Sequence, residues 1–325
     1  MRAGYRRAVE GNVMNAILSL LLCSAGAFAA DVAAPPRTFS GHSAAVEAVA
    51  FSPDGQYLAS SGLDTNVALW VVKTGKLRKL IVGHTDAVWG LDFSTDGDYL
   101  VSMANQSIEV WKVPGGKNFK TIPGSSFSMT SLKFSPNGDS FAAGGFGTIG
   151  VWTFPEGDLV HTMKADVDAV NSLAFYEGTN RIVSGNGDGS LVLWNAQEAQ
   201  AIRTIKAHTG AVRSVAVTPS SVYAVSGGLD GAVKVWRLSD GVMVSSFTAH
   251  QGGVRAVAVS PNGKYIASGG MDNLVKLWPL AGKTKAPVRE YSGHTESVEA
   301  LAFSPDGKTL ASGSKDTTVK LWKVP

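Results

Sequence analysis

The sequence predicts an all-β fold, a seven-bladed β-propeller with four antiparallel strands in each blade, and three observations support this. Seven tryptophans recur at successive spacings of 41, 41, 42, 42, 42 and 44 residues. In five repeats a histidine precedes the tryptophan by 27 or 28 residues. Turns of the type Ser-Pro-Asp-Gly or Ser-Pro-Asn-Gly recur between these two positions. A period of about 40–45 residues is typical of propeller blades. The repeating tryptophans are Trp70, Trp111, Trp152, Trp194, Trp236, Trp278 and Trp322.

The last repeat shows the strand pattern most clearly. The side chains of residues 298–303 alternate between two sets, and this two-residue period is typical of a β-strand. Residues 304–307 predict a tight turn, because Pro presets φ and Gly accepts a positive φ. Residues 308–312 are then expected to form a second strand, 313–317 another turn and 319–322 a third strand. The stretch that leads to the next histidine supplies the fourth strand in the other repeats.

The N-terminal segment is expected to close the ring. The chain ends at Pro325, directly after the third strand of the last repeat. Residues 37–39 stand before His42 in the position that residues 80–82 hold before His84. This N-terminal strand should therefore complete the last blade, which removes an open sheet edge between the chain ends.

The positions of the histidine, the turn, the aspartate and the tryptophan together resemble the WD40 repeat over residues 36–325. The resemblance implies a buried His–Ser–Asp–Trp hydrogen-bond network in each blade. Four blades carry the full set, which comprises His42, Ser60, Asp64 and Trp70, then His208, Ser226, Asp230 and Trp236, then His250, Ser268, Asp272 and Trp278, and finally His294, Ser312, Asp316 and Trp322.

Three blades depart from this pattern. Asn105 replaces the aspartate of the second blade, and Asp166 stands where the histidine of the fourth blade belongs. The third blade keeps only Trp152, and its other three positions hold Ser125, Ala143 and Phe146. The aspartate that commonly follows the tryptophan in this family is absent from every blade.

The N-terminus is predicted to be an export signal. Three arginines precede an apolar stretch, residues 16–29, which is shorter than the roughly 20 residues that a membrane-spanning helix needs. Ala27-Phe28-Ala29 offers the small residues that a signal peptidase requires, so cleavage after Ala29 is expected. Residues 30–35 then form a short Ala/Pro-rich leader, and the mature protein is expected in the periplasm. An uncleaved membrane anchor is the alternative.

Composition limits the classes of function. A formal net charge of +3 and the lack of a basic run argue against nucleic-acid binding. Cys23 is the only cysteine and lies in the predicted signal, so the mature chain is expected to have no disulfide or thiol chemistry. No motif typical of a zinc, haem, phosphate or nucleophile site is present. The sequence therefore predicts no catalytic, cofactor-binding or metal-binding residue, and a closed ring that can stand alone as a monomer.

The resemblance also implies a partner-binding face, formed by the loops that carry the histidines. The family uses three positions per blade there, namely three and five residues after the histidine and the residue before the tight-turn aspartate. The first position is Ala, Gly or Ser in every blade, which predicts an open and shallow surface.

Trp89 is the one large aromatic among these positions, and an exposed Trp is a candidate interface anchor. Its alternative role is to cover the seam between two blades. Arg213 and Arg255 lie on adjacent blades. Glu299 and Glu47 lie on another adjacent pair, and such a division of charge can orient a partner. The other predicted contacts are Leu63, Leu229, Met271 and Lys315.

These features predict a non-enzymatic scaffold that binds a protein or peptide through this face. Two alternatives stay open. An exported propeller enzyme or cofactor-dependent protein would need acids or histidines that converge on the central channel, and metal analysis with an absorption spectrum would detect it. An accessory subunit of a membrane-associated complex would be revealed by detergent-dependent co-purification.

Overall fold

The computed structural model describes residues 35–325 except 106, 124–127, 166–168, 177, 179 and 282–285. The predicted signal sequence with Cys23 lies outside the described residues, as does most of the leader. Ser125 and Asp166 also lie outside them.

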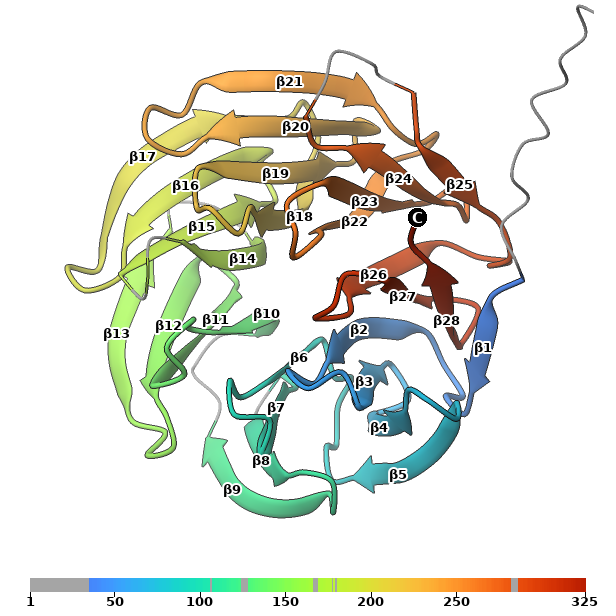
Figure 1. The fold of residues 1–325 in the computed structure, drawn as a ribbon. Coiled ribbons are helices and arrows are strands. Elements are labelled where there is room, and N and C mark those ends of the chain that lie inside the picture. Colours follow the sequence, from blue (N-terminus) through green and yellow to red (C-terminus); the bar gives the residue numbers. More distant parts are fainter. Residues whose placement is uncertain are drawn as a thin grey trace, which may run out of the picture. The chain divides into compact units, whose positions relative to one another are not determined.

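Seven four-stranded antiparallel sheets follow one another around a ring (Figure 1). The first three blades consist of β2 (Val46–Phe51), β3 (Tyr57–Gly62), β4 (Asn66–Val71) and β5 (Lys76–Val82), then β6 (Gly90–Phe93), β7 (Tyr99–Met103), β8 (Ser107–Lys112) and β9 (Lys117–Pro123), then β10 (Met129–Phe134), β11 (Ser140–Gly145), β12 (Thr148–Thr153) and β13 (Leu159–Lys164).

Blades four to six repeat this order. They consist of β14 (Val170–Tyr176), β15 (Arg181–Asn186), β16 (Ser190–Asn195) and β17 (Gln200–Lys206), then β18 (Val212–Val217), β19 (Tyr223–Gly228), β20 (Ala232–Arg237) and β21 (Met243–Thr248), then β22 (Val254–Val259), β23 (Tyr265–Gly270), β24 (Val275–Pro279) and β25 (Arg289–Tyr291). The seven-bladed fold predicted from the tryptophan period is confirmed.

The last blade joins both ends of the propeller. It contains β26 (Val298–Phe303), β27 (Thr309–Ser314) and β28 (Thr318–Lys323), and its outer strand is β1 (Arg37–Ser40). Strand β1 runs antiparallel to β28, with Phe39 opposite Val319. The predicted closure by the N-terminal strand is therefore confirmed.

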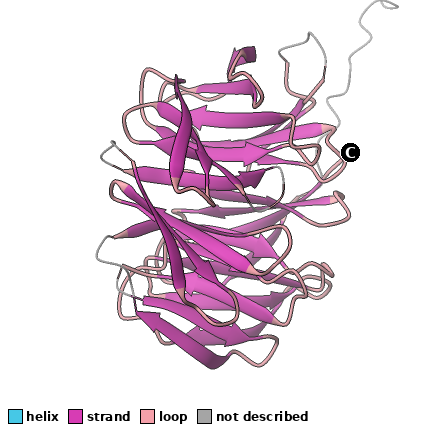
Figure 2. Ribbon diagram, turned by 90° about the vertical axis from the view of Figure 1, so that its left-hand side faces the viewer, coloured by secondary structure: helices cyan, strands magenta, loops and turns pink. Residues whose placement is uncertain are grey.

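The first strand of each blade lies innermost, and these strands surround a central channel of about 540 Å³ (Figure 1). Turned by 90°, the described part of the chain shows strands and loops without helices (Figure 2). The described residues contain no helix that could cross a membrane.

Glycines on the second strands set how closely neighbouring blades pack. A Cβ on Gly227 would lie 2.5 Å from Cγ1 of Val254 in the next blade, and a Cβ on Gly313 would lie 2.7 Å from Cγ1 of Val46. Real side chains do not approach so closely, so the valine fills the space that the glycine leaves. The equivalent glycines of the other blades with this contact are Gly144, Gly185 and Gly269.

The structure corrects one strand boundary that the sequence predicts for the last repeat, at Gly313. The sequence predicts that Gly313 begins a turn, whereas β27 continues to Ser314 and Gly313 pairs with Ala300. Glycine in a tight turn and glycine at a close packing contact look alike in a single sequence. Only the neighbouring blade shows that this one serves packing.

Candidate functional site

Hydrogen bonds link the histidine, serine, aspartate and tryptophan within each of the four blades that carry the full set. The histidine Nε2 lies 2.7–2.8 Å from the serine Oγ. The tryptophan Nε1 donates to the same Oγ over 2.8–2.9 Å. The histidine Nδ1 lies 2.7–2.9 Å from an aspartate oxygen. Because the serine hydroxyl accepts from the tryptophan, its own proton can be donated to a neutral histidine.

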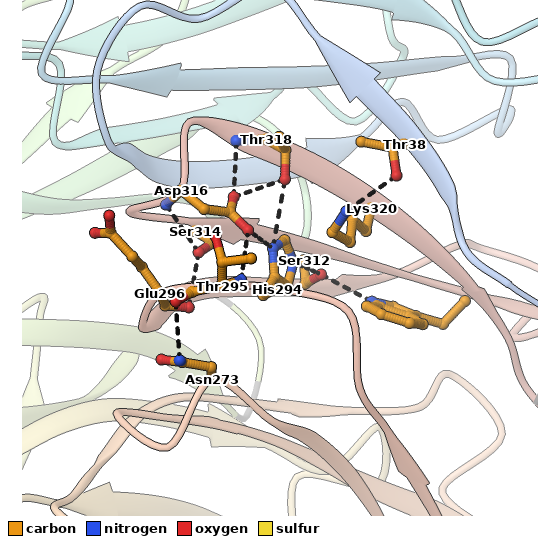
Figure 3. Close-up of polar contacts among 11 residues, drawn as sticks. Thr38, Asn273, His294, Thr295, Glu296, Ser312, Ser314, Asp316, Thr318 and Lys320 are labelled. Carbon is orange, nitrogen blue, oxygen red and sulfur yellow. Dashed lines mark hydrogen bonds and ion pairs between the residues drawn. The ribbon is translucent and has the colours of Figure 1, made fainter.

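Figure 3 shows this network in blade seven, where it anchors the loop before β26 to the turn before β28. His294 contacts both Ser312 and Asp316. Asp316 also accepts from the backbone N–H of Thr295 and from the hydroxyl of Thr318. The network thus fixes the loop that leads into the inner strand.

Burial opposes protonation of the network histidines. Desolvation lowers the pKa of His208 below its ordinary value, although Asp230 acts in the opposite direction. Desolvation by burial is also the main cause that lowers the pKa of His250 and His294. Burial alone would raise the pKa of Asp230, but hydrogen bonds from His208 and the Ala232 N–H outweigh it and lower that pKa. In blades five and seven, where the pKa of the aspartate is lowered as well, these shifts favour a neutral imidazole beside an ionised carboxylate.

The departing blades show what the missing residues cost. His84 keeps its contact with Ser102, at 2.7 Å, but its buried Nδ1 has no hydrogen-bond partner among the described residues. In blade three, Ala143 removes the hydroxyl, and Trp152 stacks on Phe141 with ring centroids 5.6 Å apart. Blade three is therefore held by apolar contacts where four others use polar ones.

Seven side chains converge where the inner strands begin, and we call them the mouth ring. A β-bulge places the ring residue in six of the seven blades, since the register shifts by one residue across it. A bulge re-aims a side chain relative to the regular alternation of a strand. The ring consists of Glu47, Trp89, Thr130, Asn171, Arg213, Arg255 and Glu299.

The mouth ring lines a cavity of about 460 Å³, which we call the mouth cavity. The residues that line it besides the ring are Asn105, Ser128, Phe146 and Ala169. Five of the predicted partner-binding residues, Trp89, Arg213, Arg255, Glu47 and Glu299, are thus brought together.

Trp89 is less exposed than an interface anchor on an open surface would be. It is partly buried and packs against a cluster of blades two and three that includes Met103, Met129 and Trp152. It covers this seam, which is the alternative role, and it also lines the mouth cavity, so its role as an interface anchor stays a prediction.

The structure keeps the arginines on blades five and six and the acids on blades seven and one, but an ion pair joins the two groups across one seam. Arg255 Nε lies 2.7 Å from Glu299 Oε2, across the seam between blades six and seven. The Glu299 side chain is only 3% exposed, and Lys315 Nζ lies 3.9 Å from its other oxygen. A buried carboxylate requires a partner, and Arg255 neutralises the charge of Glu299. The acidic and basic pairs are thus bridged at this seam.

Two ring charges lack such a partner. Among the described residues, neither Arg213 nor Glu47 has a hydrogen bond or ion pair from its side chain. Burial, and then repulsion from Arg255, lower the pKa of Arg213. Burial, and then repulsion from Glu299, raise the pKa of Glu47. Attraction between Arg213 and Glu47, and from their other charged neighbours, opposes both shifts and only partly offsets them.

The predicted apolar contacts lie on the loops outside the ring. Leu63, Leu229 and Met271 are 41%, 40% and 47% exposed. Leu229 and Met271 form one surface, because a Cβ on Gly253 would lie 3.2 Å from Leu229 Cδ2 and 3.4 Å from Met271 Sδ. Lys315, the remaining predicted contact, has a side chain that is 43% exposed.

Sequence reasoning missed Phe146 as a site residue. It stands at the position that holds the aspartate in complete blades, is 60% exposed and lines the mouth cavity. An apolar side chain at a tight turn was the available signal. Asn171 was also passed over, and its Nδ2 donates to the Val212 carbonyl over 2.9 Å.

Acidic groups do not gather here in the way a metal centre needs. Within the described ranges no three His, Cys, Asp or Glu side chains form a group that could hold a metal ion. The cavity lining includes Trp89, Phe146 and two arginines, and aromatic residues and arginine are enriched at protein interfaces.

The family comparison agrees with this architecture. The model of the WD domain, G-beta repeat (WD40), matches seven segments, residues 33–71, 75–112, 116–153, 157–195, 199–237, 241–279 and 285–323. Each of the seven segments ends one residue after a repeating tryptophan, and together they cover most of residues 33–323. The chain belongs to the WD40 repeat family of β-propellers.

Proposed function

We propose that this protein is an interaction scaffold that binds a segment of a partner protein at the mouth cavity. WD40 propellers commonly serve as scaffolds for protein partners. The observation that carries the proposal is the mouth ring itself, where one side chain per blade, placed by a bulge in six of the seven, lines a shared cavity of about 460 Å³. A ring built only for stability would not need an unpaired guanidinium and an exposed phenylalanine there.

The face around the cavity has the composition of a binding surface. Trp89 and Phe146 lie on blades two and three, whereas Arg213 lies on blade five. Trp and Arg are enriched among the residues that dominate interface energies. Leu229 and Met271 extend the surface outward with exposed apolar area. A partner segment can therefore combine apolar burial with a polar contact.

Capture from the native exported fraction tests this proposal. A protein retained by the wild type is expected to be lost from the Trp89→Ala/Phe146→Ala variant, because both aromatic contacts disappear. The matched control is Val222→Ala/Arg237→Gln, which changes exposed residues of blade five at the opposite ends of the strands. It should retain the same protein. Equal retention by all three, with unchanged melting temperatures, would contradict binding at the mouth cavity.

We further propose that the chain is exported and loses residues 1–29. The support is the sequence alone, namely an arginine-rich start, a short apolar stretch and the small residues before Ala30. Intact-mass measurement of the protein from its native exported fraction is expected to show a chain that begins at Ala30. A mass that still includes residues 1–29 would favour the uncleaved anchor.

A further inference from the structure

We propose that Arg213 is the receptor for a carboxylate, and that the partner segment supplies it from an Asp or Glu side chain. This inference rests on the proposed function and names the chemistry that the mouth cavity selects. Its starting point is a difference between two neighbouring arginines of the mouth ring, one of which is occupied and one of which is not.

Arg255 is occupied within the protein. Its Nε lies 2.7 Å from Glu299 Oε2, and breaking that contact would leave a carboxylate that is 3% exposed without its partner. Removing one member of a buried ion pair is strongly unfavourable. Arg255 therefore holds Glu299 in place through its Nε, and part of its charge is already neutralised within the protein.

Arg213 is not occupied. It stands at the equivalent position of the adjacent blade and lines the same cavity, yet its side chain has no hydrogen bond or ion pair among the described residues. The guanidinium is half-buried, and burial lowers its pKa. Glu299 and Glu47 attract its charge, but no hydrogen bond from a described residue replaces the hydration that burial removes. A carboxylate can accept two parallel N–H bonds from a guanidinium, which would offset this loss.

The charge balance at the mouth favours a carboxylate over a phosphate. Two arginines and two acids line the cavity, and Lys315, which lies outside the lining but interacts with both acids, adds a single positive charge in excess. One carboxylate cancels that excess. A phosphate monoester carries about −1.5 to −2 at pH 7 and would leave negative charge beside both acids.

The surroundings of Arg213 favour a side chain from a continuous segment. The exposed Leu229 and Met271 lie on the loops of blades five and six, the same blades as Arg213 and Arg255. Positions nearer the ring, such as Ala211 and Gly253, are small and let a backbone pass closely. A segment that lays apolar residues on Leu229 and Met271 can thus direct an acidic side chain inward to Arg213.

Selection from a library of random twelve-residue peptides, displayed with blocked C-termini, tests the inference. Peptides selected by the wild type should share an Asp or Glu next to an apolar residue. For the best synthetic peptide, changing that acid to its amide is expected to weaken binding about tenfold or more, as for a lost charge-assisted hydrogen bond. Arg213→Gln should weaken the acidic peptide equally and leave the amide peptide unchanged, which is the coupling of a direct contact.

The matched control is Arg237→Gln on the same blade, whose arginine pairs with Asp240 at the surface, 2.6 Å away. It should bind the acidic peptide like the wild type, and both variants should melt like it. Peptides that bind through Trp89 and Phe146 but show no acid, or no response to Arg213→Gln, would overturn the carboxylate while leaving the scaffold intact.

Three other outcomes also overturn the inference. A phosphoserine peptide that binds more tightly than its Asp counterpart would make phosphate the ligand. Binding confined to peptides with a free C-terminus would replace the side chain by the terminal carboxylate. Selection of no peptide that depends on Trp89 and Phe146 would overturn the scaffold function as well.

Discussion

Phe39→Ala is expected to lower the free energy of unfolding by about 3–5 kcal/mol, the usual cost of truncating a buried aromatic residue. Phe39 is 2% exposed and belongs to a cluster that spans blades seven and one. Its ring centroid lies 5.4 Å from that of Trp70 in blade one. Urea-induced unfolding followed by tryptophan fluorescence measures the effect.

Deletion of residues 36–40 should have a still larger effect, because it removes the outer strand of blade seven. Without β1, the backbone of β28 loses its four paired residues and becomes an open edge. The hydrogen bonds from Arg37 to the Val72 and Lys73 carbonyls of blade one are lost too. We expect the melting temperature of the whole ring to fall, since the first and last blades are no longer joined.

Leu77→Ala provides the control for both changes. Leu77 also lies on an outer strand, β5, but is 43% exposed, so its truncation should change the free energy of unfolding by less than about 0.5 kcal/mol. If Phe39→Ala and the deletion both matched this control, closure by β1 would contribute nothing to stability.

The second large effect is a loss of stability in mild acid, caused by four buried histidines. Burial lowers the pKa of His84, His208, His250 and His294 below the ordinary value of 6.5. Below that pH the unfolded chain binds protons that the folded chain does not. Their stabilisation is therefore complete above the unfolded pKa and is lost as the pH falls toward the folded pKa.

Each such histidine changes the free energy of unfolding by up to about 1.4 kcal/mol per pH unit. Four acting together can remove a large share of a stability of about 5–15 kcal/mol. Urea unfolding between pH 8 and pH 5 should show little slope from these groups above about pH 7.5 and a steep decline below 6.5.

His84→Gln separates this cause from general acid effects. The variant removes one of the four imidazoles, and its slope between pH 6.5 and 5 should fall by about one proton, whatever its stability at neutral pH. An unchanged slope would show that His84 does not contribute to the acid response.

The repeat made most of the fold predictable. Strands and turns follow from local patterns, namely alternation along 298–303 and the turn at 304–307. The regular spacing of Trp70 and its six counterparts predicted the number of blades, and residues 37–39 predicted the outer strand of the last blade. All of these features depend on residues close in sequence or on their repetition.

The site was predicted less completely, because its properties depend on neighbours far along the chain. Arg255 and Glu299 are 44 residues apart, and their pairing follows from the contact between two blades. Phe146 was identified from the sequence only as a departure from the aspartate position, and the cavity shows that it lines the same site as Trp89.

By itself, the sequence determined a closed seven-bladed propeller and the polar residues that fix its blades, because the same local pattern of strands and turns recurs in each repeat. Only the tertiary structure decided which charges remain without a partner. Bulges turn one side chain of six inner strands toward the channel mouth. Glu299 of the adjacent blade then pairs with Arg255, whereas Arg213 is left unpaired among the described residues. Charge compensation depends on distance in space, and a single sequence records only distance along the chain.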